Sequence, residues 1–297
     1  MRRSAQTLGG ALALFVAANL FALALTRDHQ SSEWATSLEP PEVTPDWVVI
    51  AGSYGTFGLD VETLGRALPD RGRVGKWVCA GTGPTAWSRA PSRAARGART
   101  AVVVLPALLV KYPALFRAKG LRSSYGMSDA PRLLAAGLVQ DTASLLANRL
   151  VPLFRLRKGI SSKLRAPIAR LTGMDPDYEM GTASRHDWSD FAVDELALDG
   201  LERTIQTARE QGMRVILVEW PTPGSQGREA ARQIRDGFRP FMEKFARASG
   251  VIFVPAPEEL GMTFDDEIHV PPGEGGKYSA WLAEVLADHL PIVQPNL

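Results

Sequence analysis

Short, almost wholly apolar runs recur along the chain and are separated by longer segments of mixed polarity. Several of them stop at a glycine or a proline. Runs this short, without a regular alternation of polar residues, are typical of parallel strands that are buried on both faces of a sheet. We therefore predict five strands, at residues 47–51, 74–80, 100–105, 213–219 and 251–254.

The segments between these runs carry apolar residues at helical spacing, most clearly at residues 61–68, 192–211, 226–249 and 277–290. Strands that alternate with helices predict an α/β fold with helices on both faces of a parallel sheet. Ligands of such sheets bind beyond the carboxyl ends of the strands. Gly52-Ser53 and Gly81-Thr82-Gly83 should lie at that edge.

A long interval at about residues 107–190 separates the third strand from the next strand-helix unit and should contain helices of its own. Within it, residues 142–174 carry arginine and lysine but no acidic residue. Apolar residues at helical spacing lie beside these charges, as in segments that bind a membrane surface or a polyanion. A helical subdomain with a solvated basic face is the equally weighted alternative.

The amino terminus is an uncharged run at residues 8–25, preceded by Arg2 and Arg3. Such a run can cross a bilayer as a helix, and the basic pair should stay in the cytoplasm. A cleaved signal peptide is the alternative, since Ala22-Leu23-Ala24 resembles a cleavage site. Both interpretations export the remainder. We predict an anchor or signal peptide at residues 1–27, a proline-containing tether at 28–45 and a domain at 46–297.

Composition narrows the range of functions further. The chain has 297 residues and a formal net charge of +2, which does not indicate nucleic-acid binding. Its single cysteine, Cys79, cannot form an intramolecular disulfide. No cluster of metal-ligating residues and no phosphate-binding glycine loop is evident, so no metal, nucleotide or other cofactor is predicted.

Two short patterns carry residues suited to acyl chemistry. Ser53 directly follows the first predicted strand, where a turn can direct its hydroxyl out of the sheet edge, and a serine needs a base before it is a good nucleophile. Asp266 and His269 are three residues apart ahead of the last helix, so the carboxylate can orient one imidazole nitrogen while the other faces the serine. Asp265 is the alternative orienting acid.

The two patterns resemble the first and last sequence blocks of the SGNH/GDSL hydrolase superfamily. This resemblance implies a flavodoxin-like, three-layer α/β/α sandwich with a central parallel sheet of about five strands and, in this chain, a long helical insertion after the third strand. It also implies that Ser53 is the nucleophile, His269 the general base and Asp266 its partner. The amino-terminal anchor and the exported domain look most like the cell-envelope branch, which includes alginate acetylation proteins and the D-alanine transfer protein of lipoteichoic acid synthesis.

The resemblance further implies an oxyanion hole formed by the backbone N–H groups of Ser53 and Gly81, with Gly83 as the alternative donor and a further candidate for substrate contact. The family's third block supplies an asparagine, but residues 104–108 of this chain contain no side-chain donor. Glu219 and Trp220 end the fourth predicted strand at the same edge, where they either contact substrate or form an ordinary strand end.

These observations predict a serine esterase or O-acyltransferase that acts on an acylated glycan, polymer or lipid of the cell envelope. The membrane would be contacted through residues 8–25 and through the basic segment at 142–174. A non-catalytic binding or scaffold subunit of an envelope polysaccharide machinery is the alternative, favoured by the missing asparagine. A phosphate-binding flavodoxin-like protein is a third, weaker hypothesis.

Overall fold

In the computed structural model, the chain forms two compact units. The larger consists of Ser37–Ser124 with Asp187–Leu297, and the smaller of Met1–Thr36 with Tyr125–His186. The residues that the structure describes are 16–18, 44–79, 83–88, 90–93, 97–107, 125–150, 193–221, 228–258, 260–265 and 268–293.

The larger unit is built on a parallel sheet of five strands in the order β2-β1-β3-β4-β5. This is the strand order of flavodoxin-like folds. The predicted fold class is confirmed, and each predicted strand is present with ends that shift by no more than two residues. The strands are β1 (Trp47–Ala51), β2 (Val74–Val78), β3 (Thr100–Pro106), β4 (Arg214–Trp220) and β5 (Ile252–Val254).

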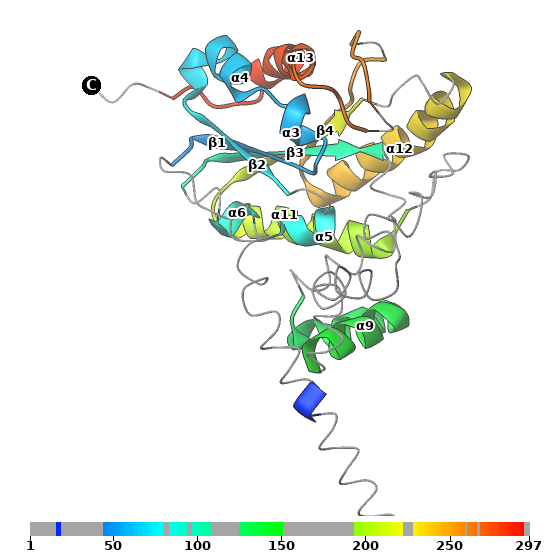
Figure 1. The fold of residues 1–297 in the computed structure, drawn as a ribbon. Helices are drawn as coiled ribbons and strands as arrows, with labels where there is room; N and C mark the ends of the chain where they lie inside the picture. Colours follow the sequence, from blue (N-terminus) through cyan, green and yellow to red (C-terminus); the bar gives the residue numbers. More distant parts are fainter. Residues whose placement is uncertain are drawn as a thin grey trace, which may run out of the picture. The chain divides into compact units, whose positions relative to one another are not determined.

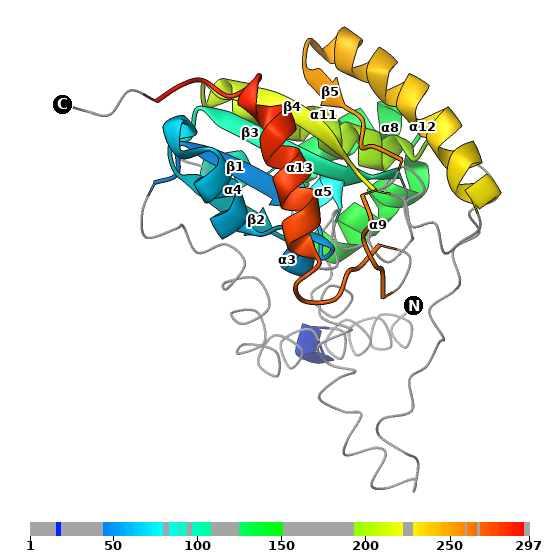
Figure 2. The ribbon, with the colours of Figure 1, turned by 90° about the horizontal axis from the view of Figure 1, so that it is seen from above.

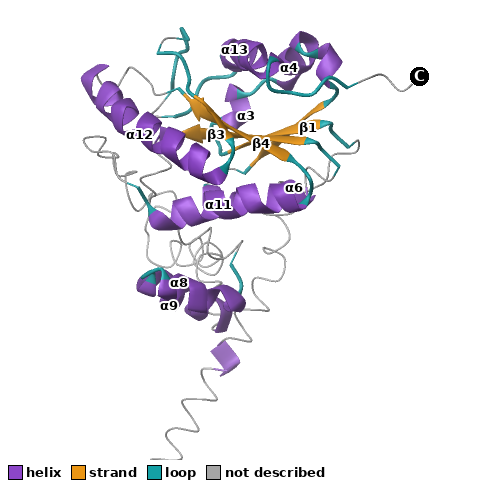
Figure 3. Ribbon diagram, turned by 180° about the vertical axis from the view of Figure 1, so that it is seen from behind, coloured by secondary structure: helices purple, strands orange, loops and turns teal. Residues whose placement is uncertain are grey.

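Helices cover both faces of the sheet (Figures 1 and 3). Seen from above, α3, α4 and α13 lie across one face (Figure 2), and α13 contacts both α3 and α4. On the opposite face α11 packs against α5 and α6, and α12 contacts β5. The helices described in this unit are α3 (Gly55–Gly58), α4 (Val61–Ala67), α5 (Pro84–Trp87), α6 (Ala90–Arg93), α11 (Glu195–Glu210), α12 (Arg228–Ser249) and α13 (Gly275–Ala287), with a 3-10 turn η1 (Pro69–Arg71).

The burial of each strand follows its place in the sheet. Every residue of the central strands β1 and β3 is buried, and so is every residue of β4 except Arg214. The edge strands β2 and β5 are only partly buried. A strand in the middle of a parallel sheet has helices on both faces, so its sequence is continuously apolar. The core therefore lies along β1, β3 and β4.

Acidic side chains determine where two of the helices begin. Asp60 accepts hydrogen bonds from the backbone of Glu62 (3.0 Å) and Thr63 (3.2 Å) at the start of α4. Asp194 accepts one from Ala197 (3.0 Å) and caps α11, which begins three residues later than predicted. Such caps satisfy amide groups that have no partner within the helix. The Thr63 hydroxyl, followed by its amide, lowers the pKa of Asp60 below its ordinary value.

In the described part of the smaller unit, a 3-10 turn η3 (Met127–Asp129) precedes helices α8 (Ala130–Ala135) and α9 (Val139–Leu150), which pack against each other. These helices lie between β3 and α11 in the sequence, as the long interval at 107–190 predicts. Most of the basic segment at 142–174 lies outside the described residues.

Among the described residues, no helix is both long and apolar enough to span a membrane. The anchor predicted at residues 8–25 lies outside that part of the chain except for residues 16–18.

Glycine allows two close contacts on the face covered by α13. A Cβ atom on Gly58, the last residue of α3, would overlap the ring of Trp220, and one on Gly275 would overlap the backbone oxygen of Phe57. Any larger residue at these positions must displace its neighbour. The absence of a side chain at Gly58 thus brings α3 directly against the end of β4.

Replacing Gly58 with alanine should therefore destabilise the protein, by about 1–3 kcal/mol, because the added methyl group overlaps a buried indole ring. Gly65→Ala is the matched control. A Cβ there has only Val74 Cγ1 nearby, at 3.8 Å, and alanine in a helix should stabilise by about 0.5–1 kcal/mol. Chemical denaturation measures both changes. Equal effects of the two substitutions would contradict the packing argument.

Candidate active site at the carboxyl edge of the sheet

Ser53 lies in the turn between β1 and α3, at the carboxyl edge of the sheet. The turn is held by hydrogen bonds from Gly55 N–H to Gly52 O and from Thr56 N–H to Ser53 O, both 3.0 Å long. Ser53 is partly exposed. Within the described residues its backbone N–H donates no hydrogen bond.

His269 lies in the loop that connects β5 to α13. Its Nε2 atom is 2.8 Å from the Oγ atom of Ser53, although the two residues are 216 positions apart in the sequence. The loop is closed locally by a hydrogen bond of 2.8 Å from Asp265 N–H to His269 O. An imidazole nitrogen at this distance can take the proton of the serine hydroxyl, which is the arrangement of an activated nucleophile.

The remaining predicted members of the site are only partly described. Asp266 and Gly81 lie outside the described residues. Gly83 is buried and precedes α5 as its cap residue. Asp265, the alternative acid, is exposed. The structure thus brings Ser53 and His269 together and leaves the roles of Asp266 and Gly81 as predictions.

Glu219 and Trp220 are completely buried at the end of β4, which fits the alternative prediction of an ordinary strand end. The Glu219 carboxylate accepts hydrogen bonds from Arg239 Nε (2.8 Å) and Ala256 N–H (3.0 Å). The Trp220 indole N–H donates to the backbone oxygen of Ile268 at 3.0 Å. The polar groups of both side chains thus bond to other parts of the protein.

An aromatic cluster surrounds Trp220. Its ring centroid is 5.2 Å from that of Tyr54, 4.6 Å from Tyr278 and 6.4 Å from Phe264. Tyr54 donates a buried hydrogen bond of 2.6 Å to Val104 O, and Tyr278 donates one of 3.1 Å to Glu219 O. Both hydroxyl groups thus have partners, as buried polar groups require.

Sequence reasoning missed the tyrosines of this cluster. The position of Tyr54 directly after the candidate nucleophile was a usable signal. Tyr278 carried none, because an aromatic residue on the inner face of an amphipathic helix looks like any other core residue.

Glu274, the residue directly before α13, binds a further part of the loop that carries His269. Glu274 accepts a hydrogen bond of 2.9 Å from Thr263 N–H, and Lys277 Nζ bridges Glu274 and Gly261 O. The Thr263 amide, followed by Lys277, lowers the pKa of Glu274. This carboxylate is therefore ionised at neutral pH and keeps its hydrogen bonds.

No protein-family model matches the chain. No curated protein matches it either. Among solved structures, the crystal structure of TesA is similar at 15% sequence identity and a TM-score of 0.38, over 80% of this chain and 97% of the TesA chain.

The described part of the chain contains no group of three or more His, Cys, Asp or Glu residues that could hold a metal ion.

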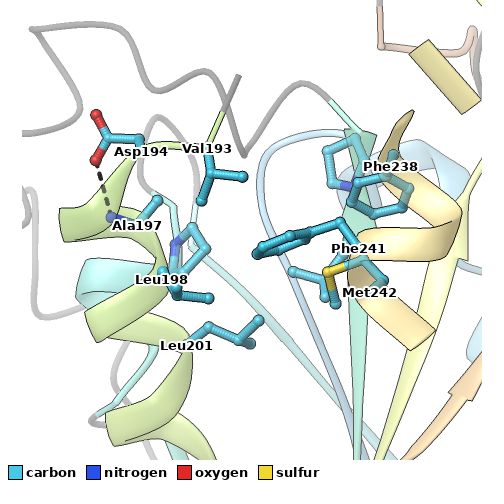
Figure 4. A pocket seen from close by; sticks show the side chains of 11 residues that line it. Val193, Asp194, Ala197, Leu198, Leu201, Phe238, Phe241 and Met242 are labelled. Carbon is cyan, nitrogen blue, oxygen red and sulfur yellow. Dashed lines mark hydrogen bonds between the residues drawn. The ribbon is translucent and has the colours of Figure 1, made fainter. Parts of the chain in front are cut away.

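An apolar cavity of about 20 Å³ lies between α11 and α12, where Leu198 and Leu201 face Phe241 (Figure 4). A cavity must exceed about 10–15 Å³ to hold a single water molecule. In this conformation it is too small for a cofactor or an acyl chain.

Tyr278 should make the stability of the protein sensitive to alkaline pH. Burial, followed by the proximity of Tyr54 and Glu219, raises the pKa of Tyr278 well above its ordinary value. Above the unfolded-state pKa of about 10, the tyrosine ionises in the unfolded chain while it stays protonated in the fold. The folded state therefore keeps its full stability below about pH 10 and loses stability as the pH rises further. Tyr278→Phe should be less stable by about 1 kcal/mol at pH 8, through loss of the hydrogen bond to Glu219 O.

The difference between wild type and Tyr278→Phe should shrink above about pH 10, because only the wild type must then keep a buried phenol protonated. Urea denaturation at a series of pH values measures it. A difference that stays constant across this range would contradict the raised pKa.

Proposed function

We propose that this protein is a serine hydrolase or acyltransferase of the SGNH type that cleaves or transfers an acyl ester. The observation that carries the proposal is the 2.8 Å contact between Ser53 Oγ and His269 Nε2 at the carboxyl edge of the sheet. Two further observations support it: the flavodoxin-like strand order and the position of Ser53 in the first turn after β1.

In the proposed reaction, Ser53 Oγ–H gives its proton to His269 Nε2 as Oγ forms a bond to the acyl carbon. The carbonyl electron pair moves to oxygen, and this oxyanion accepts hydrogen bonds from the N–H groups of Ser53 and Gly81. Collapse of the intermediate breaks the bond to the alcohol oxygen, which takes the proton from His269. Water or a sugar hydroxyl then gives its proton to His269 and attacks the acyl carbon, and Ser53 Oγ leaves with that proton.

We infer a cell-envelope setting from the amino-terminal sequence. The apolar run at residues 8–25 after Arg2 and Arg3 supports a single-pass anchor with the domain outside the cytoplasm, or a secreted domain if the run is cleaved. The proposed substrate is an acylated glycan, polymer or lipid of that compartment. The basic segment at 142–174 would assist by binding an anionic membrane surface.

One observation favours a second function, that of a non-catalytic binding subunit. Leu105, Pro106 and Ala107 at the end of β3 are all buried and offer no side-chain donor where the family supplies an asparagine. Each lost oxyanion donor typically lowers the rate by about 10²–10³-fold. The labelling experiment below separates a weakened enzyme from a binding subunit.

The wild-type protein should react with a fluorophosphonate probe and hydrolyse p-nitrophenyl acetate, whereas Ser53→Ala and His269→Ala should lose labelling and about 10⁴-fold or more of the hydrolysis rate. Ser128→Ala, at an exposed serine of the smaller unit, and His289→Ala, beyond the last turn of α13, are matched controls that should behave like the wild type. Unlabelled wild type, or labelling that persists in Ser53→Ala, would refute the catalytic proposal.

The orienting acid can be identified with a second pair of variants. Asp266→Asn should lower the hydrolysis rate by about 10⁴-fold, because the amide favours the wrong imidazole tautomer. Asp265→Asn should have little effect, since the Asp265 side chain is exposed and its contact with His269 is made by the backbone. Steady-state hydrolysis rates distinguish the two. The opposite order would reassign the acid to Asp265.

A further inference from the structure

We propose that Glu219 and Trp220, the last two residues of β4, clamp the loop between β5 and α13 and so position His269 against Ser53. Both are positioning residues, because each acts through the backbone of that loop. The proposal rests on the proposed function and deepens it by identifying what holds the two reacting groups together.

Trp220 contacts both segments that carry the reacting groups. Its indole N–H donates to the oxygen of Ile268, the residue before His269, at 3.0 Å. Its ring packs against Tyr54, the residue after Ser53, with ring centroids 5.2 Å apart. Through these two contacts, the Trp220 side chain connects the segment that carries His269 to the segment that carries Ser53.

The orientation of the Trp220 ring is restricted on several sides. It is fully buried, lies against Gly58 without room for a Cβ atom, and packs on Tyr278 with ring centroids 4.6 Å apart. A ring that cannot rotate directs its N–H to one point. The hydrogen bond to Ile268 O therefore restricts the loop more than a bond from a flexible side chain would.

Glu219 holds the start of the same loop. Its buried carboxylate accepts from Ala256 N–H at 3.0 Å, two residues after β5 ends, and from Arg239 Nε at 2.8 Å. Arg239 also donates to Ala256 O, so both backbone groups of Ala256 are engaged. A buried charge that is paired and hydrogen-bonded in this way strongly resists separation. The loop is thus held near both ends by consecutive residues of one strand.

Small displacements at a reacting pair are costly, and a shift of about 1 Å can lower a rate by about 10²-fold. Removing the Trp220 donor should therefore lower kcat more than it alters KM, since the site that receives the substrate stays in place. Loss of stability alone would not produce this pattern in assays run well below the melting temperature.

The first experiment compares Trp220→Phe with Trp47→Phe. Trp47 is a matched control because it is 1% exposed, lies at the amino end of β1, and has an indole N–H with no hydrogen-bond partner among the described residues. Both substitutions remove similar buried volume, but only Trp220→Phe removes a bond to the His269 loop. With p-nitrophenyl acetate, Trp220→Phe should lower kcat by about 10–100-fold with KM nearly unchanged. Trp47→Phe should retain the wild-type kcat.

A second variant removes the donor alone. Trp220→3-benzothienylalanine replaces the indole N–H by sulfur and keeps the shape of the ring, so it should fold and still lose kcat. Wild-type kcat in this variant, or an equal loss of kcat in Trp47→Phe, would overturn the clamp.

The third readout does not depend on activity. The imidazole resonances of His269, assigned with His269→Ala, should change in both Trp220 variants and stay unchanged in Trp47→Phe. If the wild type does not react with the fluorophosphonate probe, the proposed function is refuted. The His269 imidazole resonances then show by themselves whether Trp220 positions the loop. If it reacts and the Trp220 variants match it in both rate and resonances, the clamp fails and the function stands.

Discussion

The packing of Trp220 between the turn after β1 and the loop after β5 is the contact on which the geometry of the site depends. The indole ring lies against Gly58, Tyr54 and Tyr278, and its N–H group reaches the backbone of Ile268. A large aromatic ring can fill this position because glycine at 58 leaves the space. Displacing the ring would disturb both segments at once, and with them the 2.8 Å contact of Ser53 and His269.

Strand order explains why these segments meet. In the order β2-β1-β3-β4-β5, β1 lies inside the sheet and β4 lies two strands away, while α13, which follows the loop after β5, packs against α3 and α4. Parallel strands direct all their carboxyl ends to one edge, so Ser53 after β1 and Trp220 at the end of β4 share that edge. The loop that carries His269 contacts both, through His269 and the backbone of Ile268. The fold thus joins residues from the first and last quarters of the chain.

Polar groups beneath the site serve the same arrangement. The buried side chains of Tyr54, Tyr278 and Glu219 each form a hydrogen bond with the backbone. Their partners belong to β3, β4 and the loop after β5, respectively. Such bonds are directional and costly to leave unmade. The bond between Glu219 and Ala256 fixes the loop against the sheet, while the bonds of Tyr54 and Tyr278 fix the turn after β1 and helix α13.

The sequence by itself determined the five strands, the helices between them, and Ser53 and His269 as the candidate pair, because continuous apolar runs and a short Asp-x-x-His spacing are local patterns. Only the tertiary structure showed that Ser53 Oγ lies 2.8 Å from His269 Nε2 and that the side chains of Glu219 and Trp220 are buried. The sequence leaves two interpretations of Glu219 and Trp220 open, contact with substrate and an ordinary strand end. Their burial favours the strand end, because the residues that bind their polar groups come from distant segments that only folding brings into reach, namely Arg239, Ala256 and Ile268.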